Sequence, residues 1–186
     1  MTDRGWASRP APEVARERLL DAAGRCFVRH GPAATTLSMI AAEAGCSRPT
    51  VYRYFADRDS LRVAFIRRAA RELGASIRAE LDTSAPPREW LTDAVLAALA
   101  GVRSDETLAA WFVPDDVGTT LALASSATLV GDLASLLPGE RLGVDEGGVT
   151  AEWVVRAILS LLANPASDPG AERRLVDRLV RGLLAG

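Results

Sequence analysis

Residues 35–61 read TTLSMIAAEAGCSRPTVYRYFADRDSL, and this stretch decides the fold. Thr36 is placed to cap a short helix whose apolar residues recur at helical spacing, and Gly45 is placed to end it. Ser47 can cap a second short helix, in which Pro49 is tolerated because the amides of a first helical turn have no partner inside the helix. Two short helices joined by a tight turn that contains glycine form a helix-turn-helix.

The segments on either side of this motif also favour helices. Apolar residues recur at helical spacing from Pro12 onward, and Gly31 followed by Pro32 is expected to end that first helix. Asp57 can cap a long helix that runs to about Glu80. In chain order we therefore predict a disordered tail over 1–11, a helix-turn-helix domain over 12–57, a linking helix over 58–80 and a second domain over 81–186.

The second domain is expected to be helical as well. Residues 83–87, TSAPP, are predicted to form a hinge, and residues 138–148, PGERLGVDEGG, a flexible acidic loop. No alternating run is long enough to indicate a strand. Helices are predicted at about 87–103, 105–113, 115–137, 148–163 and 170–184. The predicted fold class is all-α.

The second short helix combines apolar anchors with exposed polar side chains. Val51 and Phe55 are expected to hold it to the core, which leaves the side chains of Arg48, Thr50 and Arg53 outside. A helix of this kind fits the major groove of DNA, which is about 12 Å wide. There an arginine can donate two hydrogen bonds to guanine, and a threonine can contact a thymine methyl group. For Arg53, a merely solvated side chain explains the pattern equally well.

Other side chains near this helix are suited to the DNA backbone. Tyr52 and Tyr54 present hydroxyl groups on rigid arms that can reach phosphate oxygens, although each is also explained as a packed aromatic residue with its hydroxyl in water. Arg58 adds positive charge in the first turn of the next helix. Arg4 and Arg9 could enter a minor groove, or they could belong to a tail that contacts nothing.

The whole stretch, together with residues 16–31, RERLLDAAGRCFVRHG, resembles the DNA-binding domain of the tetracycline-repressor (TetR) family over about residues 13–70. The matching positions are Thr36, Ile40-Ala41, Ala44-Gly45, Ser47, Thr50, Tyr52 and Tyr54-Phe55. The chain departs from the commoner family residues at Cys46, Pro49 and Arg58.

The resemblance implies phosphate contacts from Thr36, Tyr52, Tyr54 and Arg58. It implies that the base-facing residues are Ser38, Arg48, Pro49, Thr50 and Arg53, with Ser47 in the same segment. Ser38 and Arg48 occupy variable positions, so the resemblance does not give the operator sequence.

The last two predicted helices carry broad apolar stripes that either cover the domain's own core or meet a second copy of the chain. The resemblance implies a four-helix dimer interface, and a palindromic operator requires a two-fold partner. The predicted interface residues are Val154, Ile158, Leu161, Leu162, Leu175, Val176, Leu179, Val180 and Leu183.

The predicted helix over 115–137 is apolar on nearly every side but contains small and hydroxyl-bearing residues. Such a helix is expected at the centre of a domain, where it can line a mostly apolar ligand pocket. The predicted pocket residues are Trp90, Trp111, Phe112, Thr120, Ser125 and Thr128, and the aromatic ones are equally explained as ordinary core. The resemblance implies a small-molecule effector of unknown identity that releases a repressor from DNA; a regulator without an effector is the alternative.

Charge is unevenly divided along the chain. Composition is ordinary for a globular protein, with 48% hydrophobic and 25% charged residues and a net charge of −2. Residues 1–80 hold 14 arginines against 9 acidic residues, a balance of +5, whereas residues 81–186 hold 8 against 15, a balance of −7. A basic front half is expected where a protein meets a polyanion, although chance and solvated helix faces also produce one.

Two rival function classes follow from the same residues. An enzyme of helical fold is disfavoured because the chain has one histidine, His30, and no metal-ligand cluster or phosphate-binding glycine loop, so we expect no catalytic residue, metal or cofactor. A non-specific architectural DNA-binding dimer would depend on phosphate contacts and minor-groove wedges and not on base-facing side chains.

The sequence also predicts the compartment. Cys26 and Cys46 each lie in an apolar helical pattern and are expected to be buried thiols, not a disulfide or a metal pair. The N-terminus lacks the apolar segment of a secretion signal. Residues 117–137 are apolar, but Asp132 and several hydroxyl groups disfavour a membrane span. We expect a soluble cytoplasmic protein that has no membrane partner.

Overall fold

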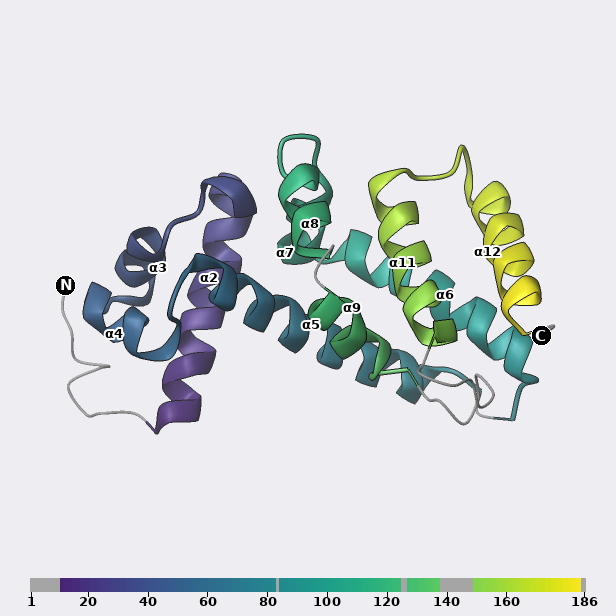
Figure 1. Ribbon diagram of the computed structural model, residues 1–186, viewed down its shortest axis with the longest axis horizontal. Coiled ribbons are helices and arrows are strands. Elements are labelled where there is room, and N and C mark those ends of the chain that lie inside the picture. The colour runs from purple at the N-terminus through teal and green to yellow at the C-terminus, as the bar shows by residue number, and fades with distance from the viewer. Residues whose placement is uncertain (1–10, 83, 125–126, 138–148, 185–186) are drawn as a thin grey trace. The chain divides into compact units, whose positions relative to one another are not determined.

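The computed structural model describes residues 11–82, 84–124, 127–137 and 149–184, and every regular element within them is helical (Figure 1). The prediction of an all-α fold is confirmed. The elements are α2 (Pro12–Ala34), α3 (Leu37–Ala44), α4 (Arg48–Tyr54), α5 (Arg58–Glu80), α6 (Pro87–Ser104), α7 (Glu106–Ala109), the 3₁₀ turn η1 (Ala110–Phe112), α8 (Val117–Ala124), α9 (Ala127–Ala134), α11 (Val149–Ala163) and α12 (Pro169–Leu183). The predicted tail up to residue 10 and the predicted loop at 138–148 lie outside the described residues.

Two predicted helices are divided in the structure. The one expected over 105–113 is α7 followed by η1, and it ends where Val113 adopts an extended conformation because Pro114 follows it. The one expected over 115–137 is present as α8 and α9, with residues 125 and 126 outside the description. The expectation of a helix buried on every side is wrong for α8, since Leu121 is 45% exposed.

Within the described ranges no single helix is both long and apolar enough to cross a membrane. The segments Val117–Leu123 and Thr128–Ala134 reach the required length and composition only when they are counted together.

The chain forms two compact units. The first unit comprises Met1–Ile66 and Glu106–Leu123, and the second comprises Arg67–Asp105 and Ala124–Gly186, apart from the residues that are not described. The segment Glu106–Leu123, which the sequence assigns to the second domain, therefore clusters with the helix-turn-helix.

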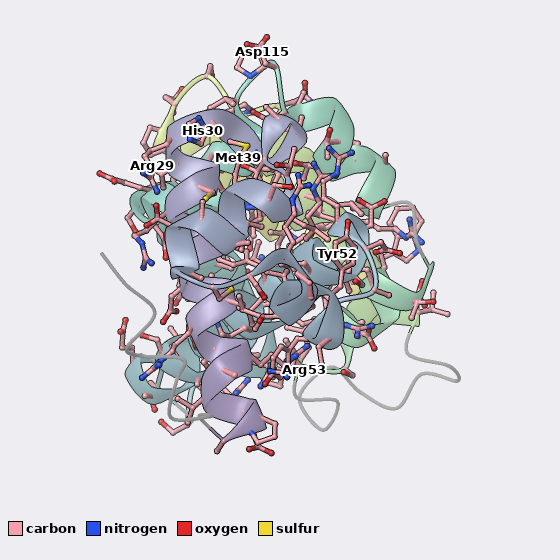
Figure 2. All side chains as sticks on the ribbon, turned by 90° about the vertical axis from the view of Figure 1, so that its left-hand side faces the viewer. Arg29, His30, Met39, Tyr52, Arg53 and Asp115 are labelled. Carbon is pink, nitrogen blue, oxygen red and sulfur yellow. The ribbon has the colours of Figure 1, made fainter. Side chains whose placement is uncertain are left out.

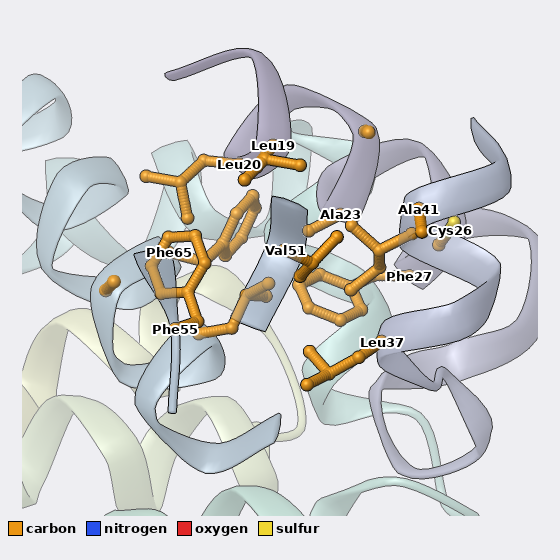
Figure 3. Packing of buried hydrophobic residues seen from close by; sticks show 14 of the residues in the cluster. Leu19, Leu20, Ala23, Cys26, Phe27, Leu37, Ala41, Val51, Phe55 and Phe65 are labelled. Atoms are coloured by element: carbon orange, nitrogen blue, oxygen red, sulfur yellow. The ribbon is translucent and has the colours of Figure 1, made fainter. Parts of the chain in front are cut away.

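The core of the first unit joins α2, α3, α4 and the start of α5 (Figure 3). Three aromatic rings lie at its centre: the Phe27 and Phe65 centroids are 5.0 Å apart, and the Phe27 and Trp111 centroids are 5.1 Å apart, both in edge-to-face geometry. Such pairs stabilise a core beyond their area of burial. Trp111 thus brings η1 into the core that supports the helix-turn-helix.

The second unit is built on α6, against which α11 and α12 both pack, and α11 also packs against α9. Arg67 on α5 forms an ion pair with Asp132 on α9. The fully or nearly buried apolar residues of these helices include Trp90, Leu91, Val95, Leu99, Val130, Val154, Leu162, Val176 and Val180.

The predicted dimer interface stays a prediction. Val154, Leu162, Val176 and Val180 are buried inside the unit's own core in the single chain. Among the other predicted residues, Ile158, Leu161, Leu179 and Leu183 are half-buried and Leu175 is exposed. The amphipathic stripes could not distinguish the two roles, because both require apolar side chains.

A charged pair holds α12 to α6. Arg103 donates two hydrogen bonds of 2.7 Å to the carboxylate of Glu172 and a third, of 3.1 Å, to the Leu161 carbonyl oxygen. The hydrogen bonds from Arg103 lower the pKa of the buried Glu172 carboxyl. A carboxyl with a lowered pKa in the folded state adds stability above its unfolded pKa and loses it as the pH falls through the folded pKa.

Glu172→Gln is therefore expected to reduce the free energy of unfolding at pH 7 by ~1–2 kcal/mol, a figure that allows for the partial exposure of Arg103. The difference from the wild type should shrink below pH 4, where wild-type Glu172 also takes up a proton. Urea unfolding at several pH values measures both effects. Glu89→Gln, at an exposed carboxylate, is the control and should keep the wild-type pH dependence; equal curves for Glu172→Gln and the wild type would contradict the prediction.

Candidate nucleic-acid interface

Local hydrogen bonds fix the start and the end of α3. The hydroxyl oxygen of Thr36 accepts from the Met39 amide at 3.3 Å, which caps the helix as predicted. Gly45 has φ 67° and ψ 35°, the left-handed conformation that glycine adopts without strain. The amides of Gly45 and Cys46 return to the carbonyl oxygens of Ala42 and Ala41. The predicted turn of the helix-turn-helix is therefore confirmed.

A similar cap begins α4. The Ser47 hydroxyl oxygen accepts from the Thr50 amide at 3.3 Å, and the hydroxyl groups of Ser47 and Thr50 share a hydrogen bond of 2.9 Å. Val51 is fully buried, and Phe55 is nearly so at the end of the helix. The guanidinium of Arg16 lies 5.3 Å from the centre of the Phe55 ring. One face of α4 is thus anchored in the core, as the sequence indicates.

The other face of α4 is exposed. Arg48, Pro49, Tyr52 and Arg53 are all exposed, and Tyr52 is 57% exposed. Figure 2 shows Tyr52 and Arg53 on this part of the molecule. The guanidinium of Arg53 lies 5.1 Å from the centre of the Tyr54 ring and donates to its hydroxyl oxygen at 3.4 Å. Arg53 therefore packs along Tyr54, which is itself half-buried against the core. Arginine stacked on an aromatic face is held in place more firmly than a solvated one.

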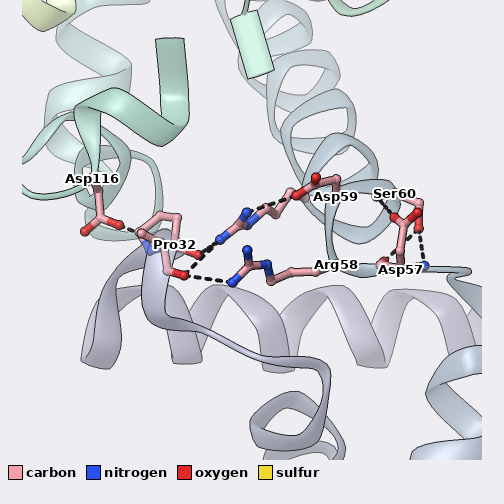
Figure 4. A network of polar contacts seen from close by, with 8 residues as sticks. Pro32, Asp57, Arg58, Asp59, Ser60 and Asp116 are labelled. Carbon is pink, nitrogen blue, oxygen red and sulfur yellow. Dashed lines mark hydrogen bonds and ion pairs between the residues drawn. The ribbon is translucent and has the colours of Figure 1, made fainter. Parts of the chain in front are cut away.

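The start of α5 lies beside the same helices. The Asp57 carboxylate accepts from the Ser60 amide at 2.7 Å, and the Ser60 hydroxyl oxygen accepts from the Asp57 amide at 3.2 Å. The bond from Ser60 lowers the pKa of Asp57. Arg58 donates to the carbonyl oxygen of Ala33 at 3.0 Å, so one of its five donor hydrogens is engaged and others remain (Figure 4). Of the predicted contacts on α3, Thr36 is exposed and Ser38 is half-buried.

The sequence did not reveal one further element of this surface. Arg25 and Arg29, one helical turn apart on α2, both bind the carboxylate of Glu43 on α3; the Arg25 bond measures 2.6 Å. Hydrogen bonds from these two arginines lower the pKa of Glu43. The clamp ties α3 to α2. The spacing of the two arginines in the sequence indicates that they lie on one face of α2, but it does not indicate which carboxylate they bind.

The predicted pocket residues do not come together in one unit. Trp111 is core in the first unit, Phe112 is half-buried against that core, and Thr120 donates its hydroxyl hydrogen to the Trp111 carbonyl oxygen. Trp90 is buried in the second unit, and Thr128 is exposed there. Ser125 lies outside the described residues, as do Arg4 and Arg9. Cys26 and Cys46 are free thiols, the first buried and the second partly buried.

Comparison with known proteins identifies similar sequences. Residues 19–65 match the family described as bacterial regulatory proteins, tetR family. The chain is 36% identical over 183 residues to an uncharacterized HTH-type transcriptional regulator of Mycobacterium tuberculosis. The aligned residues cover 97% of this chain and 90% of that protein. It is 34% identical over 97 residues to the HTH-type transcriptional regulator BetI of Brucella anthropi, and this alignment covers 52% of this chain and 50% of BetI.

A solved structure agrees on the fold. The TetR family repressor AlkX from Dietzia sp. superposes with a TM-score of 0.70 at 21% sequence identity, over 91% of this chain and 95% of AlkX. The helix-turn-helix geometry, the match over its helices and the near full-length relative lead to one conclusion. The chain belongs to the TetR family of bacterial transcriptional regulators.

Proposed function

We propose that this regulator is a dimeric repressor that binds a palindromic operator through α4 and is released by a small, largely apolar effector. The observation that carries the proposal is the two-sided character of α4. Val51 fixes one face in the core, while Arg48 and Tyr52 stand exposed on the other. A short helix anchored in this way can enter a major groove without unfolding the domain.

Base recognition is assigned to the first turn of α4. Arg48 is exposed and makes no hydrogen bond with any described residue, so its guanidinium can donate both hydrogens to one guanine. The hydroxyl group of Thr50 is already engaged with Ser47. Its methyl group is then the part left for a base, which favours a thymine methyl. Ser38, Pro49 and Arg53 complete the proposed base-facing set.

Phosphate contacts are assigned to the residues around this turn. The exposed hydroxyl of Tyr52 and the remaining donors of Arg58 suit phosphate oxygens, as do the groups of Thr36 and Tyr54. These contacts set the position of α4 on the duplex and carry no sequence information by themselves.

Dimerisation is assigned to the exposed sides of α11 and α12. Trp153 is 55% exposed on α11 and Leu175 is 53% exposed on α12, and Val149, the first residue of α11, is also exposed. Tryptophan is among the residues that most often anchor an interface, and exposed leucine and valine add apolar area beside it. A two-fold pair of chains would present two copies of α4, as a palindrome requires.

Effector control needs only a modest energy difference. An effector that prefers the non-binding state by ~3 kcal/mol lowers operator affinity about a hundredfold. The buried Thr92 hydroxyl on α6 has no hydrogen-bond partner among the described residues, and Trp90 lies two positions before it. Both belong to the half of the chain to which effector binding is assigned.

Arg48→Ala tests the proposal. Starting from the duplex that the wild-type protein selects out of a random pool, the substitution is expected to cost ~1–3 kcal/mol of binding free energy and to relax the preference at one base pair in each half-site. Tyr52→Phe is the control, because loss of a phosphate contact should weaken binding on all sequences alike. Equal losses for Arg48→Ala on every duplex, or no palindromic preference in the wild type, would overturn base recognition and favour an architectural DNA-binding dimer.

A further inference from the structure

The helical range of α2 is broken at Gly31, and its last residues together with Thr35 form a turn that leads into α3. Gly31 has φ 75° and ψ 152°, a conformation that residues with a side chain rarely adopt. The Gly31 carbonyl oxygen accepts from both the amide and the hydroxyl of Thr35, at 3.2 and 2.7 Å. Thr36, the cap of α3, follows directly. The shape of this turn therefore sets the direction in which α3 begins.

A carboxylate from a distant part of the sequence enters this turn. Asp116 is only 5% exposed, and its Oδ1 accepts from the Ala33 amide at 2.6 Å, across 83 positions of sequence. A Cβ atom placed on Gly31 would collide with this carboxylate, and its distance to the Asp116 Cγ would be 3.0 Å. The absence of a side chain at position 31 thus makes room for Asp116.

Arginines occupy the other side of the turn (Figure 4). Arg62, 3% exposed, donates to the carbonyl oxygens of Pro32 and Ala33 and to the Asp59 carboxylate, while Arg58 also donates to Ala33. Burial lowers the pKa of Arg62 and the nearby Arg58 adds to this effect, whereas Asp59 and Asp116 act in the opposite direction. The polar backbone atoms of Pro32 and Ala33 are thus all held by side chains.

Asp116 is itself carried on a rigid support. Its carbonyl oxygen accepts from the Thr120 amide at 3.1 Å in the first turn of α8. The Thr120 hydroxyl group donates in turn to the carbonyl oxygen of Trp111, whose buried indole packs against both Phe27 and Phe65. These bonds fix the position of the Asp116 carboxylate relative to the core, independently of its bond to the turn.

We propose that Asp116 is a positioning residue for operator binding, because it holds the Gly31–Thr35 turn in the shape that directs α3 and Thr36 toward DNA. The expected effect on operator binding rests on the proposed function. The expected effect of Asp116 on the shape of the turn does not. Removal of the carboxylate would leave the partly buried Ala33 amide without an acceptor, whereas Arg62 would keep its ion pair with Asp59.

The test compares Asp116→Ala with Asp115→Ala in the full-length protein. Asp115 is the matched control, because it is exposed and its loss changes the net charge equally. Amide hydrogen exchange, followed without DNA, is expected to accelerate about tenfold or more over residues 33–40 in Asp116→Ala and to stay unchanged in α12. The ratio of operator affinity to scrambled-duplex affinity is expected to fall about tenfold. Asp115→Ala should change neither quantity.

A conservative variant separates positioning from a general loss of stability. Asp116→Asn keeps an oxygen that can accept from the Ala33 amide, so it is expected to return both quantities to within about threefold of the wild type. If Asp116→Ala does not fold, Asp116→Glu, which moves the carboxylate by one methylene, is expected to show the same two changes.

Unchanged exchange over residues 33–40, or an unchanged affinity ratio in a folded dimer that lacks the carboxylate, overturns the proposal. If the wild-type protein selects no duplex at all, it is the proposed function that fails. The hydrogen-exchange rates of Asp116→Ala and the wild type then still show whether Asp116 stabilises the turn.

Discussion

Trp111→Ala is expected to lower the free energy of unfolding by ~3–5 kcal/mol, the range measured when large buried aromatic residues are truncated. The indole is 2% exposed and contacts both Phe27 and Phe65, so its loss leaves a cavity under the helix-turn-helix. Native domains are stable by only about 5–15 kcal/mol, so this loss would remove a large fraction of the total stability. Urea unfolding followed by circular dichroism measures the change.

Two further variants make this prediction specific. Trp111→Phe is expected to cost less than half as much, because the buried indole N–H has no hydrogen-bond partner among the described residues and a ring still fills most of the space. Val113→Ala, two positions along and exposed, should cost less than ~0.5 kcal/mol. A cost below ~1 kcal/mol for Trp111→Ala would show that η1 does not belong to this core.

Trp153→Glu combined with Leu175→Glu is expected to convert the protein to a monomer and to lower operator affinity at least about a hundredfold. Each substitution places a charge where the proposed interface excludes water, and a single chain can hold only one half-site. Both positions are more than half exposed in the single chain, so its own fold should tolerate the change. Sedimentation velocity and operator titration measure the two effects.

The matched control is Leu121→Glu, which replaces another exposed leucine, in this case on α8 in the first unit. It should remain dimeric and bind the operator like the wild type. A dimer that survives the double substitution with unchanged sedimentation would show that α11 and α12 do not form the contact between the two chains.

The local signals in the sequence were sufficient for most helix boundaries. Thr36, Ser47 and Asp57 each accept the hydrogen bond from the amide three positions later that their types predict. Gly45 ends α3 with a positive φ angle, and Gly31, also with a positive φ angle, breaks α2, whose helical range nevertheless extends to Ala34. These features depend on residues within one turn of each other, and adjacent residues meet whatever the rest of the chain does.

The apolar stripes of the last two helices left open which of their residues are buried within the chain. Val154 and Trp153 are neighbours in sequence and both apolar, yet the first is fully buried and the second more than half exposed. Val176 and Leu175 differ in the same way. A stripe of apolar residues shows that a helix face is covered, but not whether its own chain or another one covers it.

The helix-turn-helix, its caps and the anchored and exposed faces of α4 could be predicted from the sequence, because these follow from hydrogen bonds and spacing within short segments. Only the tertiary structure decided that Trp111 supports this motif and that Asp116 enters the turn before α3. Both residues lie more than 80 positions from their partners Phe27 and Ala33. Contacts of that range form only when the packing of whole helices brings distant segments together, and no local pattern encodes which segments will meet.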